Sequence, residues 1–299
     1  MSSSINTACK SHNVRRMIVI LALLGFAAVT FAQDIALHPP SGAIAGQATS
    51  ISTGGSGSAT FYLIGPSGTV KRDVQLGGEI ALGAGELRAS GRYVVVVCSG
   101  SCSSGSFFVS PAMPSSMIFL VHPSRAPVSQ SDVISGVAIP FDEFQNQVLA
   151  PATVQFELVA KGGSPSPRGV ETRAGIAWFR TNSGKSAGAL QVQASIKDVI
   201  ARRVVQQVAS DPCSLRIKGQ RSSNGIIVET EPVRDCSGNP VPDGTIVTFT
   251  AKNGNEMSTV DAPVKQDVAR ARMAAKGPVV ISAASGVVMG NELHLGAQD

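Results

Sequence analysis

The stretch that decides the fold is Arg234–Ala251, RDCSGNPVPDGTIVTFTA. Its residues Ser237–Asn239 are of types that accept left-handed backbone angles, as a tight turn requires. Pro240 and Pro242 lack a backbone N–H, so they cannot lie in a central strand and they mark a corner. After the corner, Val247–Ala251 alternates apolar residues with threonine. This period of two predicts a strand with one buried face.

Two further runs follow the corner strand. Ala269–Met273 alternates again and places both of its arginines on one face, and Val279–Ala284 has the composition of a terminal strand. These residues resemble the invasin/intimin-type bacterial Ig-like domain. That family has a D-x-x-G-N-P-V-P corner, a V-T-F-T/S-A strand, an alternating A-x-A-x strand and a terminal V-x-V-x-A strand. Asp261–Asp267 departs from the family pattern, because it lacks the glycine that usually opens the late strand.

The resemblance weakens toward the N-terminus. Asp142–Val148 occupies the corner position of an earlier segment and Val154–Leu158 follows it, but the glycine and both prolines of the corner are absent. Further upstream the likeness is only generally Ig-like. There Tyr93 stands where a tyrosine hydroxyl bonds back across a corner, and Val95 stands where an immunoglobulin has its cysteine.

Short alternating or β-branched runs, separated by Gly, Pro, Ser and Asn, recur along the chain and favour sandwiches over βαβ units. Three openings resemble one another: Ile35–Pro39, Phe119–Pro123 and Leu215–Ile217. We therefore predict an all-β chain of tandem Ig-like β-sandwich domains after an N-terminal signal peptide. The predicted boundaries are 1–32 for the signal peptide, then 33–112, 113–208 and 209–299, the last being the invasin/intimin-type domain.

One stretch admits a second interpretation. Ser195–Val208 could form a helix with Ile196, Val199, Ile200 and Val204 on one face. Its Val and Ile content favours two strands with a turn near Asp198 instead.

The N-terminus has the organisation of an export signal. Lys10, Arg15 and Arg16 precede an uncharged apolar run, Met17–Ala32, with small residues at its end. This pattern predicts a signal peptide cleaved after Ala32, and the alternative is an uncleaved anchor. We expect no membrane span in the mature chain. The expected location is the periplasm, the cell surface or the extracellular space.

The export signal accounts for most of the apparent basicity. The chain has 25 Lys and Arg against 20 Asp and Glu, a formal net charge of +5. Three cations and no anion precede residue 33, which leaves 22 cations and a net charge of +2. A modest excess remains in residues 113–208, with nine cations and six anions. Nucleic acid is therefore not an expected partner.

Four cysteines follow the export signal: Cys98, Cys102, Cys213 and Cys236. An even number in an exported chain favours disulfides, and the economical pairing joins Cys98 to Cys102 and Cys213 to Cys236. A zinc site is the alternative, but the histidines of the mature chain are remote in sequence from both pairs.

No motif for catalysis or cofactor binding is present. The sequence lacks G-x-S-x-G, a P-loop, H-E-x-x-H and a calcium-loop spacing. Asp142–Glu143 could bind a cation, and His38 and His122 could act as ligands or pH sensors, but a solvated turn and polar strand ends explain them better. We expect no enzyme activity, no cofactor and no metal.

The remaining candidates are contacts for a ligand. Arg202 and Arg203 contribute to the basic 113–208 segment, which could meet an anionic glycan or could be an ordinary mixed surface. Trp178 is the only Trp, and we expect it in the sandwich core rather than on an exposed sugar-stacking platform. The resemblance implies a non-enzymatic surface or periplasmic structural or adhesion module, with a protein or glycan of the envelope or host surface as partner. The alternative is a polysaccharide-binding protein.

Overall fold

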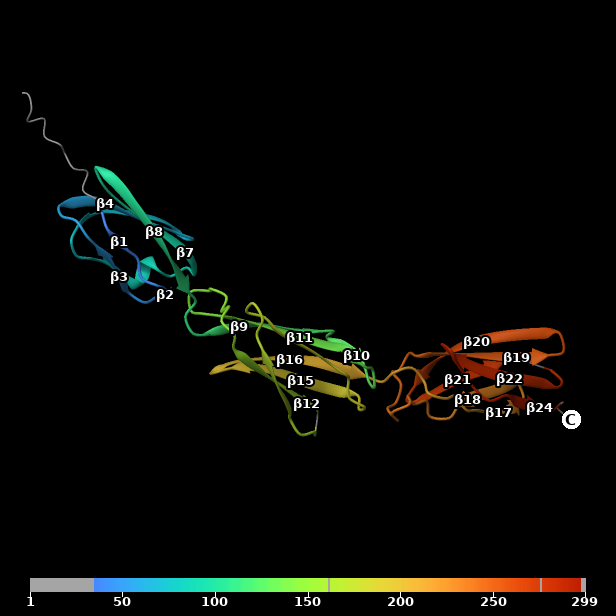
Figure 1. Cartoon of the computed structure of the whole chain (residues 1–299). Helices are drawn as coiled ribbons and strands as arrows, with labels where there is room; N and C mark the ends of the chain where they lie inside the picture. The colour runs from blue at the N-terminus through green and yellow to red at the C-terminus, as the bar shows by residue number, and fades with distance from the viewer. Residues whose placement is uncertain (1–34, 161, 275, 297–299) are drawn as a thin grey trace, which may run out of the picture. The chain divides into compact units, whose positions relative to one another are not determined.

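The computed structural model describes residues 35–160, 162–274 and 276–296, and the predicted signal peptide lies outside them. The described regular structure consists of strands and one 3-10 turn, Ala84–Glu86 (Figure 1). The chain divides into two compact units, one ending at Ser110 and the other beginning at Pro111. We call residues 35–110 the first segment, 111–208 the second and 209–296 the third.

The first segment consists of two sheets. The small sheet has the order β1–β3–β6, and the large sheet has the order β2–β8–β7–β4–β5, in which β2 pairs in parallel with β8. Their bounds are β1 Leu37–His38, β2 Ala43–Ile44, β3 Thr49–Thr53, β4 Ser58–Gly65, β5 Gly68–Gln75, β6 Glu79–Leu82, β7 Gly91–Ser99 and β8 Ser101–Ser110.

The second segment repeats this topology. Its small sheet has the order β14–β11–β9, and its large sheet has the order β10–β16–β15–β12–β13, with β10 parallel to β16. The bounds are β9 Ser116–His122, β10 Arg125–Pro127, β11 Ile134–Phe141, β12 Thr153–Ala160, β13 Ser166–Glu171, β14 Ala177–Thr181, β15 Gly188–Ile196 and β16 Val199–Val208. The helical interpretation of Ser195–Val208 is thereby excluded, because β15 and β16 form a hairpin there.

In the third segment all strands belong to one continuous path, β17–β18–β21–β20–β19–β22–β23, with β24 also paired to β22. The bounds are β17 Ile217–Ser222, β18 Gly225–Thr230, β19 Ile246–Asn253, β20 Glu256–Lys265, β21 Val268–Met273, β22 Val279–Ser285, β23 Val288–Met289 and β24 Leu293–Leu295. The prediction that Val279–Ala284 is terminal was wrong. The short strands β23 and β24 follow it and pair along it.

A proline explains why the segments open differently. In the first two segments the opening strand ends at His38 or His122, and a proline comes next. Proline has no N–H to donate to the ladder of the small sheet, so the chain leaves that sheet there. It crosses to the large sheet, where β2 pairs in parallel with β8 and β10 pairs in parallel with β16. The third segment has no proline there, and β17 continues to Ser222. Of the predicted opening Leu215–Ile217, only Ile217 belongs to β17, and Leu215 makes an isolated bridge with Gly290.

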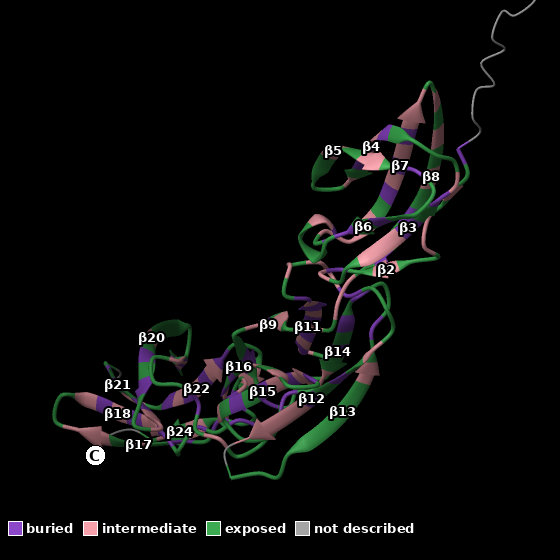
Figure 2. Ribbon diagram, turned by 90° about the vertical axis from the view of Figure 1, so that its left-hand side faces the viewer, coloured by how far each residue is buried: buried purple, intermediate pink, exposed green. Residues whose placement is uncertain are grey.

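Each segment buries its own apolar residues. In the first segment, Tyr93 is buried and its hydroxyl donates to the Ala89 carbonyl at 3.0 Å, which confirms the predicted tyrosine corner. A Cβ at Gly65 would come within 2.2 Å of the Tyr93 ring, so the last position of β4 requires glycine. Figure 2 shows the buried bands that alternate with partly exposed ones along β7.

The other two cores follow the same alternation. In the second segment the rings of Phe119, Phe156 and Phe179 form a chain, with centroids 6.0 and 4.6 Å apart. In the third segment Val247, Phe249 and Ala251 are buried in the core, as the corner strand predicted. These cores and the strand orders above confirm the all-β sandwich class.

The two disulfides are those of the economical pairing. Cys98 and Cys102 face each other across the β7–β8 hairpin, and Cys213 joins Cys236 at the corner of the third segment. The S–S distances are 2.01 and 2.10 Å. Neither pair is therefore available to a zinc ion.

Candidate ligand-binding face

Two buried aspartates organise equivalent corners in the second and third segments. The Asp142 carboxylate accepts backbone N–H bonds from Phe144 and Asn146 at 2.9 and 2.8 Å, and one from the incoming peptide at Ala112, at 2.9 Å. The side-chain amide of Asn146 also donates to the Asp142 carboxylate, at 2.8 Å.

The third segment repeats this arrangement with different residues. Asp235 accepts from the backbone of Ser237 and Asn239 at 2.8 and 2.9 Å, from the incoming peptide at Ser210 at 3.0 Å, and from the Asn239 amide. The correspondence supports the assignment of Asp142 to the corner position.

The missing glycine of the second corner is replaced without loss of the turn. Gly238 has φ +84°, and Gln145 at the same place has φ +65°. Each donates its N–H to the carbonyl of the corner aspartate, at 3.0 and 3.1 Å. The β20–β21 hairpin also turns without glycine, on Gln266 and Asp267 at φ +52° and +70°.

Burial raises the pKa of Asp142 and of Asp235, but the hydrogen bonds to each carboxylate outweigh it, so both pKa values lie below the ordinary 3.8. The oxygens of Asp142 are thus occupied by donors from its own corner. Among the described residues no group of three His, Cys, Asp or Glu is placed to hold a metal ion. The expectation of a solvated turn at Asp142–Glu143 was wrong for Asp142, which is buried and uses its carboxylate to hold the corner.

The third-segment corner also contacts the second segment. The Asn239 amide donates to the Lys185 carbonyl at 2.7 Å, and its oxygen accepts from the Ala187 N–H at 2.9 Å. The hydroxyl of Ser237 lies 2.5 Å from that of Ser129. The corner therefore joins two neighbouring segments.

The outer face of the β9–β11–β14 sheet is apolar. Leu120, Val137 and Trp178 lie opposite one another across the three strands. The exposed fraction of the residue is 59% for Leu120 and 61% for Trp178. The next row is formed by Ile118 and Ile139, with Ile176 immediately before β14. We call these six residues the apolar face.

The expectation that Trp178 lies in the core was wrong. The run Ile176–Arg180 contains the signal that would have placed it. Because strand residues alternate, Trp178 shares a face with Arg180, whereas Ala177 and Phe179 share the other face and are buried. An arginine two residues away indicates the solvent side.

A polar row borders the apolar face. His122, Ser135 and Arg180 lie opposite one another across the same three strands, one step along from the Trp178 row. Arg168 on the edge strand β13, which is largely exposed in Figure 2, donates to the Arg180 carbonyl at 3.1 Å. Two guanidinium groups therefore lie along β14.

These arginines lack carboxylate partners. Within the described residues, every ion pair belongs to the first or the third segment, and none to the second. The basic excess of the second segment is thus not neutralised internally.

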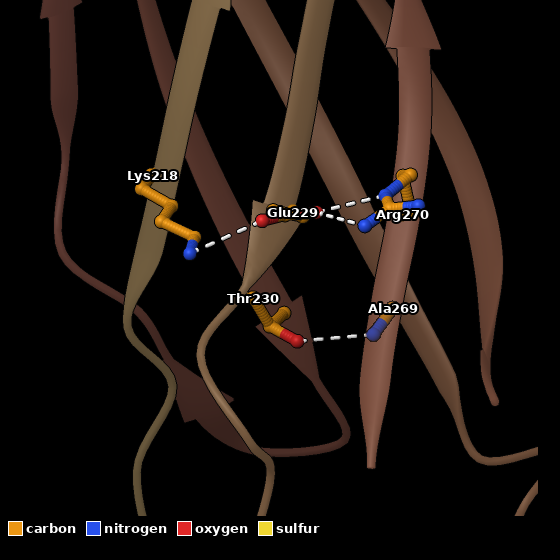
Figure 3. Close-up of polar contacts among 5 residues, drawn as sticks. All are labelled: Lys218, Glu229, Thr230, Ala269 and Arg270. Carbon is orange, nitrogen blue, oxygen red and sulfur yellow. Dashed lines mark hydrogen bonds and ion pairs between the residues drawn. The ribbon is translucent and has the colours of Figure 1, made fainter. Parts of the chain in front are cut away.

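The corresponding strands of the other two segments present different faces. On β17–β18–β21, Glu229 lies between Lys218 and Arg270, with N–O distances of 3.2 and 2.5 Å (Figure 3). Hydrogen bonds from Arg270 and then Lys218 lower the pKa of Glu229 below its ordinary 4.5. On β1–β3–β6 the facing residues are small or polar: His38, Ser50, Ser52, Glu79 and Ala81. The apolar face is peculiar to the second segment among these three.

The other candidate contacts lie elsewhere. Arg202 and Arg203 are on β16 of the large sheet, where the Arg202 guanidinium donates to the Gln193 side chain at 2.8 Å. Arg203 donates to the Arg202 carbonyl. The structure therefore brings Trp178 together with Arg180 and Arg168, which the sequence did not single out as contacts, and places Arg202 and Arg203 on the other sheet.

The part of the chain that the structure describes contains no helix long and apolar enough to cross a membrane. No family model matches the sequence, and no curated protein matches it significantly. The fold, however, is that of bacterial Ig-like adhesin domains.

Three solved structures support this statement. The Escherichia coli adhesin FdeC has a TM-score of 0.62 at 15% identity, over 89% of this chain and 97% of that one. Invasin, a bacterial integrin-binding protein, has a TM-score of 0.53 at 12% identity, over 90% of this chain and 60% of that one. InvD of Yersinia pseudotuberculosis has a TM-score of 0.51 at 11% identity, over 88% and 97%.

Proposed function

We propose that this protein is an exported, non-enzymatic bacterial Ig-like repeat protein that serves as a structural and adhesion module at the cell surface or in the periplasm. Its working units are the domains 33–112, 113–208 and 209–299, preceded by the signal peptide 1–32. The fold shared with adhesins and the two disulfides support this proposal.

The observation that carries the adhesive function is the apolar face. Apolar side chains scattered singly over a surface are ordinary, but these are contiguous across three strands. Tryptophan and arginine are also the residue types that dominate binding energy at interfaces. The second domain therefore supplies the recognition surface, and the corner of the third domain contacts it through Asn239.

Polysaccharide binding is the second candidate. The exposure of Trp178 favours it, because an open indole provides a flat surface for a sugar ring. A protein partner at the host or envelope surface would use the same side chain.

The test is retention of the purified protein on envelope fractions and on host-cell surfaces. We expect Trp178→Ala to weaken retention at least tenfold. The matched control is Ile200→Ala, which removes a 52% exposed apolar side chain from the large sheet and should leave retention unchanged. Equal retention of both variants and the parent would overturn the assignment of the face.

Export is tested separately. The N-terminal sequence of the protein recovered from the periplasm or medium should begin at Gln33. Recovery of an intact N-terminus in the membrane fraction would support an uncleaved anchor instead.

A further inference from the structure

We infer that the apolar face binds an acidic saccharide, with a pyranose ring on Trp178 and its carboxylate or sulfate at Arg180. This inference rests on the proposed function and names the ligand of the same face. Four features of the face support it: geometry, charge, size and hydrogen-bonding capacity.

The geometry suits one substituted sugar ring. Trp178 and Arg180 are two residues apart on the same face of β14, so their Cα atoms are separated by about 7 Å. A ring stacked on the indole therefore places an acidic substituent within reach of the flexible arginine side chain. A guanidinium group binds carboxylates and sulfates through paired N–H donors.

The charge of the face favours an anionic partner. Arg180 forms no ion pair with any residue that the structure describes, and Arg168 brings a second guanidinium to the same strand. No carboxylate lies on either apolar row or on the polar row. A second copy docked face to face would thus offer Arg180 no counter-charge.

The size of the face fits a small ligand. Three strands about 4.8 Å apart and two rows about 7 Å apart give a patch of roughly 200 Å² once side chains are included. A stable protein interface needs about 800 Å² from each partner. The patch covers one or two sugar units.

The polar row supplies what sugar hydroxyls need. The Ser135 hydroxyl donates to the His122 carbonyl at 3.4 Å and its oxygen can still accept, and the exposed His122 imidazole lies opposite it on the neighbouring strand. The apolar rows contact the C–H faces of the ring, while the polar row meets its hydroxyls.

The experiment uses intrinsic fluorescence, because Trp178 is the only Trp and its emission reports the site directly. The purified protein is titrated with an oligogalacturonate, a sulfated galactose oligomer and the matched neutral galactose oligomer. We expect both acidic oligomers to change the emission, and the neutral oligomer to bind at least tenfold more weakly.

Two charge variants locate the contact. Arg180→Gln should weaken acidic binding about tenfold or more, whereas Arg202→Gln, which removes the same charge from the large sheet, should leave it unchanged. Calorimetry with Trp178→Ala should show no binding. Circular dichroism of each variant checks that the fold is retained.

The results distinguish a failure of the acidic-saccharide inference from a failure of the proposed function. Equal binding of neutral and acidic oligomers, or equal losses in Arg180→Gln and Arg202→Gln, would overturn the acidic-saccharide inference. An absence of sugar binding together with a Trp178-dependent retention on cell surfaces would also overturn it, in favour of a protein ligand, and would leave the proposed function intact. An absence of both would overturn the proposed function as well.

Discussion

The β9–β11–β14 sheet of the second segment and the strands β17–β18–β21 of the third belong to segments with equivalent corners, yet they present opposite chemistry to solvent. Across β9–β11–β14 the central row is Leu120, Val137 and Trp178, whereas across β17–β18–β21 it is Lys218, Glu229 and Arg270. The inward residues of both sheets are apolar. The fold therefore constrains one side of the sheet and leaves the other free to differ.

The largest effect should come from breaking what the two segments share. We expect Asp142→Ala and Asp235→Ala each to lower the free energy of unfolding by about 3 kcal/mol, because several buried N–H donors lose their acceptor. Urea unfolding measures this. Asp198→Ala, at the exposed turn between β15 and β16, is the control and should change little. A large loss in only one corner variant would contradict the equivalence of the corners.

Acid should weaken the same corners more gradually. Both aspartates have a folded-state pKa below 3.8, so the unfolded state binds protons first as the pH falls. Their contribution is complete above the ordinary pKa and is lost as the pH falls through the folded-state value. The free energy of unfolding, measured from pH 5 downward, should fall less steeply in Asp142→Asn and Asp235→Asn than in the parent. Parallel slopes would exclude the corners as the acid-sensitive groups.

Exchanging the outer rows tests the difference between the segments. The triple variant Leu120→Lys, Val137→Glu and Trp178→Arg gives the second segment the ionic row of the third. We expect the free energy of unfolding to change by about 1 kcal/mol or less, since Leu120 and Trp178 are largely exposed and Val137 is only partly buried, while retention on the cell surface is lost. Failure of this variant to fold would show that the apolar face serves stability.

The smallest effect is expected at the ionic row itself. Glu229→Gln should lower the free energy of unfolding by about 0.5 kcal/mol, because its ion pairs with Lys218 and Arg270 are exposed on the cation side. The contribution of Glu229 should be present above its ordinary pKa of 4.5 and lost at lower pH. Thermal unfolding at low and high salt measures it. An effect as large as that of the corner variants would make this row a structural element.

Local residue pattern was enough to predict the fold. The corner after Arg234, the alternation in β19 and the tyrosine at position 93 each depend on neighbours in sequence, and each is present in the structure. The edge strand β13 and the strand β20, which lies between β21 and β19, were missed. Their residues are mostly exposed, so they lack the apolar alternation that reveals a strand.

The candidate site was less accessible to sequence reasoning. Trp178 was expected in the core because aromatic residues usually pack there, although Arg180 two positions later indicated the outer face. Its neighbours Leu120 and Val137 come from strands distant in sequence, and only the register places them in one row. Likewise, Arg202 and Arg203 are close to one another in sequence but lie on a different sheet from Trp178.

Each corner aspartate binds the peptide that leads into its own segment, at Ala112 and at Ser210. The acceptor and the strands it anchors therefore belong to a single stretch of sequence. A gene duplication that copied such a stretch would copy its attachment to the preceding peptide as well. A chain of such tandem segments can lengthen by recombination, because each added segment brings its own aspartate to bind the peptide that precedes it.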